Sequence, residues 1–389
     1  MLAVGIMFLG AGIGEAVLQV ARSILPAGFV DHVTLRELGK FAQGAVVFGV
    51  GIVLVGLAGW QLRRTSFGIT LSIVEQQSPG HVLVTRQPTA GLPSAVVFSG
   101  HMGLLIMLNA LQDSVGRLLA VPPSGSDFRT IARLIRTSHS DARVVSATAE
   151  NAQLCAELTN GEIVSGAGAL EDGVPAPIRR VYLSSNSKDG AVPDWPVSQE
   201  LQEAISAAGL IVFGPGSFFT SVLPSLLVTG VRDRIAAAKA STVLICNVMT
   251  EPGRTDGWTV SDFIRTFSDY AGFPPHFTIV NRSYPGSNIL SRYEVTGSYP
   301  IMVTPEEHLD ASKVVLGSHF PGSTTLSIGG STVIEADIIE VINESRLTLD
   351  PEGGTTREQT VSVIRHDSEK LGRVIRNIIV QSRSQALAG

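Results

Sequence analysis

A glycine-rich segment follows an apolar run and has the composition of an anion-binding turn. The run Leu210–Phe213 is typical of a buried strand, and the positions after it include Gly214, Pro215, Gly216, Ser217, Thr220 and Ser221. Glycines let a phosphate approach the backbone, and the N-terminus of a following helix offers free N–H groups. The segment therefore predicts a phosphate site. The alternative is an ordinary turn with a serine cap.

A second polar segment follows the next apolar run, Val243–Cys246. Its amide, hydroxyl, carboxylate and glycine positions include Asn247, Thr250, Gly253, Thr255 and Asp256. The carboxyl ends of neighbouring strands converge in an α/β sheet, so we expect both segments to line one crevice. The alternative is a long turn before a helix that is capped by Thr259 or Ser261.

Three further positions carry groups that could act in a site, and each has a competing structural explanation. His101 is either a phosphate donor or the first residue of a helix without a ligand. Near the C-terminus, either residues 365–367 reach the crevice, or Asp367 caps the last helix and His366 is a partly exposed neighbour. Asp256 is the acidic residue best placed to contact a metal or a ribose, but one carboxylate alone does not make a metal site.

Strand-like and helix-like segments alternate along the chain after residue 65. This alternation predicts an α/β fold in one domain, residues 65–389, with a mostly parallel sheet covered by helices on both faces. The predicted strands are 67–74, 81–85, 95–99, 143–147, 153–158, 162–165, 178–183, 210–213, 242–247, 277–280 and 313–316. The predicted helices are 102–111, 199–208, 226–240, 260–270 and 367–382. Segments 184–196 and 284–305 are rich in glycine, proline and serine and predict loops.

The composition narrows the class of protein. The 389 residues carry 29 basic and 34 acidic side chains, a net charge of −5, which argues against a nucleic-acid binder. Only 16 % of residues are charged, 44 % are hydrophobic, and the mean hydropathy is +0.28. Cys155 and Cys246 are too few for a disulfide framework and lie in apolar runs, which predicts buried free thiols and a reducing compartment.

The apolar excess is concentrated at the N-terminus. The segment Phe41–Leu62 contains no charged residue and ends beside Arg63 and Arg64, and Met1–Ala21 carries a single charge. An uncharged stretch of this length spans a bilayer, and an arginine pair suits its interface. We therefore expect a transmembrane helical hairpin over residues 1–64, with both chain termini on the cytoplasmic side.

Several segments resemble the YvcK/CofD family, which comprises the gluconeogenesis factors and the 2-phospho-L-lactate transferase. They read LTNGEIVSGAGALEDGVPAPIRRVYL from Leu158, GPGSFFTSVLPSLLVTGV from Gly214, CNVMTEPGRTDGWT from Cys246 and RHDSEKL from Arg365. The resemblance implies a Rossmann-like domain that binds a nucleotide or a nucleotide sugar. Members of the YvcK type bind UDP-sugars and affect carbon metabolism, cell-wall precursor supply and cell shape. Members with two N-terminal membrane helices form a known subtype, which implies the bacterial inner membrane with the soluble domain in the cytoplasm.

This chain departs from the family pattern at five places. The first glycine loop, usually GGGTG, reads SGHMG here and keeps Gly100 and Gly103 as ligand-binding candidates. An acidic pair expected after the second strand is absent, and a helical insertion of the family is missing. Arg254 replaces a glutamate of the family, and Ser225 replaces an asparagine. Because the missing acids are the natural metal and catalytic groups, a divalent-metal cofactor is doubtful, and no catalytic or metal-binding residue is assigned.

Three functions fit these observations. The first is a membrane-anchored regulator that binds a nucleotide-type small molecule, such as a UDP-sugar, without turning it over. The second is a transferase of the 2-phospho-L-lactate type, which the missing acidic pair argues against. The third is a degenerate scaffold, which the retained glycine and Asn–Thr segments argue against. A homo-oligomer is left open, and no nucleic-acid partner is expected.

Overall fold

The computed structural model describes residues 92–124, 132, 133, 135, 143–149, 152–184, 195–314, 320, 323–349 and 356–388. The predicted hairpin at 1–64 and the predicted strands at 67–74 and 81–85 lie outside these residues. In the part of the chain that is described, no helix combines the length and the apolar character needed to cross a membrane.

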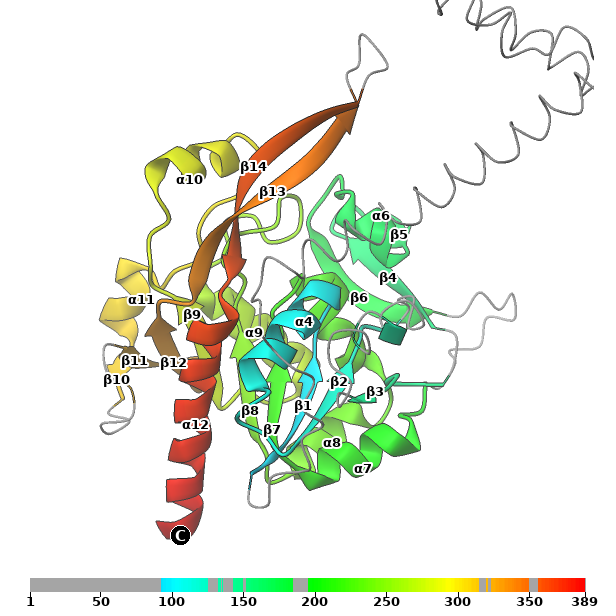
Figure 1. The fold of residues 1–389 in the computed structure, drawn as a ribbon. Helices are drawn as coiled ribbons and strands as arrows, with labels where there is room; N and C mark the ends of the chain where they lie inside the picture. Colours follow the sequence, from blue (N-terminus) through cyan, green and yellow to red (C-terminus); the bar gives the residue numbers. More distant parts are fainter. Residues whose placement is uncertain are drawn as a thin grey trace, which may run out of the picture. The chain divides into compact units, whose positions relative to one another are not determined.

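Nine strands of the described residues form one sheet (Figure 1). In sheet order they are β10 (Ser312–Lys313), β11 (Thr324–Ile328), β12 (Ser331–Ala336), β9 (Phe277–Asn281), β8 (Ser241–Ile245), β7 (Ala208–Phe213), β1 (Ser94–Phe98), β2 (Arg117–Val121) and β3 (Arg143–Val144). Every pair from β12 to β3 is parallel, and β10 and β11 add an antiparallel edge. The prediction of a mostly parallel α/β sheet is confirmed.

Both faces of this sheet are covered, as the near-continuous apolar runs predict. Successive residues of β1 point to opposite faces, so Val96 and Phe98 join one apolar layer while Ala95 and Val97 join the other. The first layer includes side chains of α7 (Gln199–Ala207), α8 (Val231–Ala237) and α9 (Val260–Ala271). The second includes side chains of α4 (His101–Leu111) and α12 (Ser368–Ala388).

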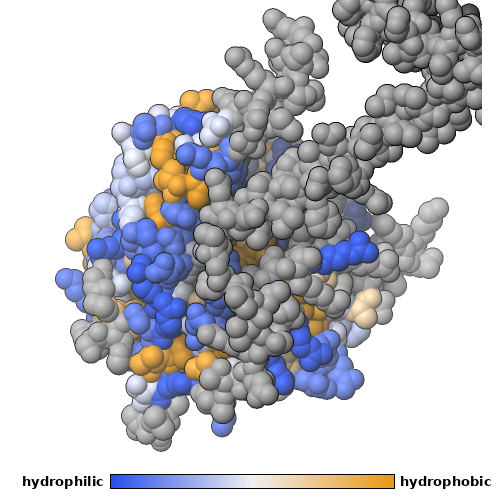
Figure 2. Space-filling model, viewed as in Figure 1, coloured by the Kyte–Doolittle hydropathy of each residue, from blue (hydrophilic) through white to orange (hydrophobic). Residues whose placement is uncertain are grey.

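Two smaller sheets extend from this core. A three-stranded antiparallel sheet contains β5 (Ile163–Ser165), β4 (Gln153–Leu158) and β6 (Ile178–Ser184), with the short helix α6 (Ala167–Glu171) between β5 and β6. A long two-stranded ribbon contains β13 (Ile339–Leu349) and β14 (Thr356–His366) and projects beside α10 (Ser287–Glu294) (Figure 1). On the face shown in Figure 2, the visible surface of the described residues is mainly hydrophilic, with small apolar groups between.

The structure corrects four element predictions. Instead of one helix over 226–240, η2 (Leu223–Leu227) and α8 are separate, because Gly230 adopts a φ of 83° at the N-cap of α8. The predicted loop 284–305 contains α10, and α11 (Pro305–Asp310) follows it. Strand β10, Ser312–Lys313, begins one residue before the predicted strand 313–316, whose residues 315 and 316 lie outside the described residues. The ribbon β13–β14 and the strands β2, β11 and β12 were not predicted.

Candidate functional site

The candidate site lies at the carboxyl ends of β1 and β7. The strand order runs β9-β8-β7 on one side of β1 and β2-β3 on the other, so the chain reverses its direction across the sheet between β1 and β7. In open α/β sheets ligands bind outside the strands at such a switch point. The turn after β1 leads into α4, and the turn after β7 leads into η1 (Phe218–Val222), which is one turn of π-helix. The two glycine segments singled out in the sequence are these two turns.

The two turns interlock through positions that only glycine can occupy. A Cβ added to Gly103 would lie 1.7 Å from the Pro215 carbonyl oxygen, and one added to Gly100 would lie 2.5 Å from Ser221 Oγ. The Ser99 hydroxyl donates a hydrogen bond to the same Pro215 carbonyl. Gly214 and Gly216 have φ angles of 91° and 156°, which side chains disfavour. The structure thus brings Gly100, Gly103, Gly214, Pro215, Gly216 and Ser221 together.

Polar groups at this junction are available to a ligand. The N-cap of α4 is Gly100, which has no side chain to cap the helix, and the first turn of α4 contains no acidic residue. The first N–H groups of α4 therefore keep their capacity to bind an anion. Ser221 is 8 % exposed, and its hydroxyl makes no hydrogen bond to another described residue. His101 and Met102 are exposed at the start of the helix.

Glu251 joins the β7 turn to the loop after β8. Its carboxylate accepts hydrogen bonds from Ser217 Oγ at 3.0 Å, from Asn247 Nδ2 at 3.1 Å and from the Phe218 N–H. Arg254 Nε lies 3.4 Å from Glu251 Oε2, and both side chains are nearly buried, at 11 % and 13 % exposed. Burial raises the pKa of Glu251, while Arg254 and the hydrogen bonds oppose this shift. No role for Glu251 was predicted from the sequence.

The remaining predicted residues of the second loop have separate partners. Thr255 Oγ1 accepts a hydrogen bond from the Glu251 N–H at 2.8 Å, so it shapes the loop itself. Thr250 Oγ1 accepts one from the Tyr299 N–H at 2.8 Å. Gly253 has a φ of 78° and packs against the backbone of Val174.

Two predicted residues lie away from the interlocked turns in different ways. Thr220 donates a hydrogen bond to Glu171 Oε1 at 2.9 Å, which ties the β7 turn to α6. Asp256 is exposed and forms no hydrogen bond or ion pair with another described residue. Among the described residues, no hydrogen bond directs either side chain toward Gly100 or Gly216.

His366 reaches the carboxyl end of β8. Its Nε2 lies 3.2 Å from the Cys246 carbonyl oxygen, one residue before Asn247. Burial lowers the pKa of His366 to about 4, so the ring is neutral near pH 7 and Nε2 carries the proton that it donates. Asp367 Oδ1 accepts hydrogen bonds from the N–H groups of Glu369 and Lys370, which confirms that it caps α12. The expectation that Asp367 caps the last helix is therefore confirmed, and the expectation that this segment reaches a ligand stays a prediction.

Both cysteines are buried, and the described residues contain no metal-ligand cluster. Cys155 and Cys246 are buried free thiols, as predicted, and burial raises the pKa of Cys246. Within the described ranges, no three His, Cys, Asp or Glu side chains are placed to hold a metal ion.

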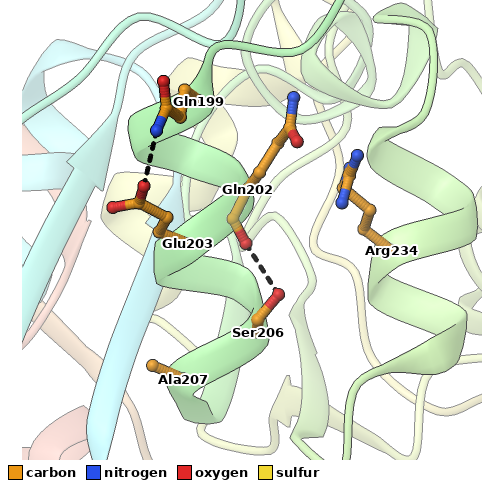
Figure 3. Close-up of a pocket in the computed structure, with 6 residues that line it drawn as sticks. All are labelled: Gln199, Gln202, Glu203, Ser206, Ala207 and Arg234. Carbon is orange, nitrogen blue, oxygen red and sulfur yellow. Dashed lines mark hydrogen bonds between the residues drawn. The ribbon is translucent and has the colours of Figure 1, made fainter.

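A surface groove lies between α7 and α8 (Figure 3). It has a volume of about 810 Å³ and is lined by Gln199, Gln202, Glu203, Ser206, Ala207 and Arg234. Gln199 binds Glu203, and Ser206 binds the Gln202 carbonyl, so these groups are satisfied within their own helix. The lining contains none of the predicted site residues.

Comparison with known proteins identifies the family. Residues 107–320 match the family model described as 2-phospho-L-lactate transferase CofD, and this range is more than half of the chain. The chain belongs to the CofD family. A Thermotoga maritima relative is 30 % identical to this CofD-family chain over 254 residues, which cover 65 % of this chain and 68 % of the relative.

Two further relatives carry the name gluconeogenesis factor. The protein from Halalkalibacterium halodurans is 34 % identical over 202 residues, and the protein from Bacillus subtilis is 31 % identical over 185 residues. These matches cover 50 % and 47 % of this CofD-family chain and 59 % and 56 % of the relatives, so the chain spans little more than half of their length.

The fold also has a counterpart among solved structures. The crystal structure of a Bacillus halodurans protein, titled as a member of the UPF0052 family, superposes with a TM-score of 0.53 at 22 % sequence identity. The superposition covers 73 % of this CofD-family chain and 99 % of the other chain. This similarity supports the Rossmann-like arrangement of the sheet and helices.

Proposed function

We propose that this CofD-family chain binds a nucleotide or a nucleotide sugar of the UDP-sugar type and acts as a regulator of carbon metabolism or cell-wall precursor supply. The observation that carries the proposal is the interlocked pair of turns at the switch point, with an uncapped α4 N-terminus and the unpartnered Ser221 hydroxyl beside it. The names of the relatives support the regulatory part.

The diphosphate fits the start of α4 better than it fits the β7 turn. At α4, backbone N–H groups are free, Gly100 leaves the backbone open, and no acidic side chain lies in the first turn. At the β7 turn, Ser217 and the Phe218 N–H already bind the Glu251 carboxylate. We therefore assign the first ligand phosphate to the α4 end of the crevice.

The membrane part of the proposal rests on the sequence. The charge-free segment Phe41–Leu62 and the apolar segment Met1–Ala21 form the proposed hairpin that anchors the domain to the inner membrane, with the domain on the cytoplasmic side. A tethered sensor of a nucleotide sugar would then act close to the surface where lipid-linked cell-wall precursors are made.

A transferase is the second candidate, because the matched family model is described by that activity. Such an enzyme needs a positioned carboxylate for a metal or for proton transfer. Glu251 is engaged by four groups of the chain, and Asp256 stands alone at the surface. These positions favour a binding protein over an enzyme.

The experiment is a calorimetric titration of the full chain with UDP-N-acetylglucosamine, with UDP and GDP in parallel. Ser221→Ala removes a hydroxyl that has no partner among the described residues, so the fold is expected to stay intact. One lost hydrogen bond is worth about 0.5–1.5 kcal/mol, so the dissociation constant should rise about threefold to tenfold. Ser206→Ala on α7 is the matched control and should bind like the parent. If Ser221→Ala also binds like the parent, the ligand lies elsewhere.

A further inference from the structure

Four donor groups from two loops converge on one carboxylate. Ser217 Oγ and the Phe218 N–H come from the β7 turn, and Asn247 Nδ2 and the Arg254 guanidinium come from the loop after β8. The carboxylate is Glu251, which belongs to the second loop itself. Hydroxyl, amide and guanidinium donors bind phosphate oxygens with the same geometry as they bind carboxylate oxygens.

Glu251 does not saturate these donors. Arg254 Nε is buried and lies 3.4 Å from Glu251 Oε2, yet it forms no hydrogen bond of good geometry with any described residue, while Arg254 Nη1 donates to the Leu170 carbonyl oxygen at 2.8 Å. Most buried polar atoms are hydrogen-bonded, so an unmatched donor in this cluster requires an explanation. Burial also raises the pKa of Glu251, which means that holding this carboxylate in its charged form inside the cluster costs free energy.

The cluster adjoins the open end of α4. Ser217 follows Gly216, and a Cβ built on Gly216 would lie 3.3 Å from the Gly100 backbone nitrogen, the N-cap of α4. Two anion positions are therefore neighbours at the switch point, one open and one filled by the chain. A diphosphate carries two linked anionic groups and could occupy both.

We propose that Ser217, the Phe218 N–H, Asn247 and Arg254 form a second phosphate site, which the Glu251 carboxylate fills until a ligand phosphate displaces it. This inference rests on the proposed nucleotide function, since the ligand that reaches both positions is a diphosphate. The Glu251 carboxylate competes with the ligand phosphate for these four donors and so sets how tightly a diphosphate binds. Pro252 and Gly253 follow it, and Gly253 has a φ of 78°, so the backbone turns sharply just beyond the carboxylate.

The test is a calorimetric titration of the full chain with inorganic pyrophosphate. Glu251→Ala vacates the position and leaves Arg254 without its counter-charge, so pyrophosphate should bind about tenfold more tightly than to the parent. Adding Arg254→Ala to Glu251→Ala should reverse the gain. Asp310→Ala removes an exposed carboxylate of α11, outside the candidate site, and should leave the affinity unchanged.

Each outcome decides the proposal. A folded Glu251→Ala variant that binds pyrophosphate no better than the parent shows that Glu251 is a structural ion-pair partner only. If Glu251→Ala loses its cooperative thermal transition, Glu251→Gln is titrated instead, because it keeps the shape and removes the charge. If both variants unfold, the carboxylate is part of the fold and the proposal is wrong. If Glu251→Ala binds pyrophosphate more tightly than the parent but the protein does not bind UDP-N-acetylglucosamine, the phosphate site is supported and the proposed nucleotide-sugar function is wrong.

Discussion

Gly103 lies where the backbone of one turn touches the backbone of another. The nearest atom to an added Cβ would be the Pro215 carbonyl oxygen at 1.7 Å, and the Ser99 hydroxyl lies just beyond it. The Pro215 carbonyl belongs to the backbone and cannot rotate out of the way as a side chain could, so a methyl group here must separate the turns. The glycine is therefore required by close approach and not by its φ angle.

Gly103→Ala is expected to destabilise the fold by about 3 kcal/mol or more, because overpacking a rigid contact usually costs 1–3 kcal/mol and this contact is between backbones. Gly168→Ala is the control, since nothing lies within 4 Å of a Cβ at that position in α6. Its free energy of unfolding should stay within about 1 kcal/mol of the parent value. Urea unfolding of the three proteins measures the difference. Equal midpoints for Gly103→Ala and the parent would contradict the interlocked turns.

At the scale of elements, His366 ties the end of the ribbon to the central sheet. It is the last residue of β14, it pairs with Ile339 of β13, and its ring meets the carbonyl after β8. Tyr293 of α10 binds the ribbon a second time, through a hydrogen bond from the Ile364 N–H at 2.9 Å. These contacts, with the hydrogen bond from Lys370 Nζ to the Ile339 carbonyl oxygen, fix the ribbon at its base.

The low pKa of His366 predicts a loss of stability in mild acid. The ordinary pKa of 6.5 applies to the unfolded chain, and burial lowers the folded value to about 4. As the pH falls from 6.5 towards 4, the unfolded chain binds a proton that the folded chain does not, so the free energy of unfolding falls, by at most about 3 kcal/mol. Above pH 6.5 this contribution is fully present.

Urea unfolding at several pH values measures the slope. His366→Gln keeps a donor for the Cys246 carbonyl and cannot titrate, so its slope between pH 6.5 and 4 should be shallower than that of the parent. The exposed His101 provides the control, and His101→Gln should keep the parent slope. A parent-like slope in His366→Gln would assign the acid sensitivity to other groups.

At the scale of the whole molecule, residues 1–64 are expected to hold the protein in the membrane. The reason is the charge-free segment Phe41–Leu62 and its apolar partner Met1–Ala21. After sodium carbonate washing, the full chain should stay with the membrane pellet, and a chain without residues 1–64 should move to the supernatant. Release of the full chain by carbonate would contradict the anchor.

The sequence alone determined the class of fold and the place of the two polar segments. Apolar runs such as 210–213, each followed by glycine and hydroxyl residues, are local patterns, so they predict buried strands that end in turns. Local chemistry also placed the caps at Asp367 and near Thr259, where the structure finds a capping box with Asp262. The hairpin β13–β14 was not predicted from the sequence, because Asn343 and Ser345 interrupt the apolar positions 339, 341, 347 and 349 and weaken the alternation that predicts a strand.

Tertiary structure decided which of these segments meet. The order of strands places β7 beside β1, so Gly103 touches a residue more than a hundred positions away, and no local pattern contains that information. The same holds for Glu251, which looks like a loop carboxylate in sequence and becomes the partner of Ser217 only when β7 and β8 lie side by side. Thr220 is the opposite case. It lies in the turn that was predicted to bind a ligand, but its hydroxyl donates a hydrogen bond to Glu171 of α6. Contacts between distant segments depend on strand order and packing, and these are properties of the folded chain.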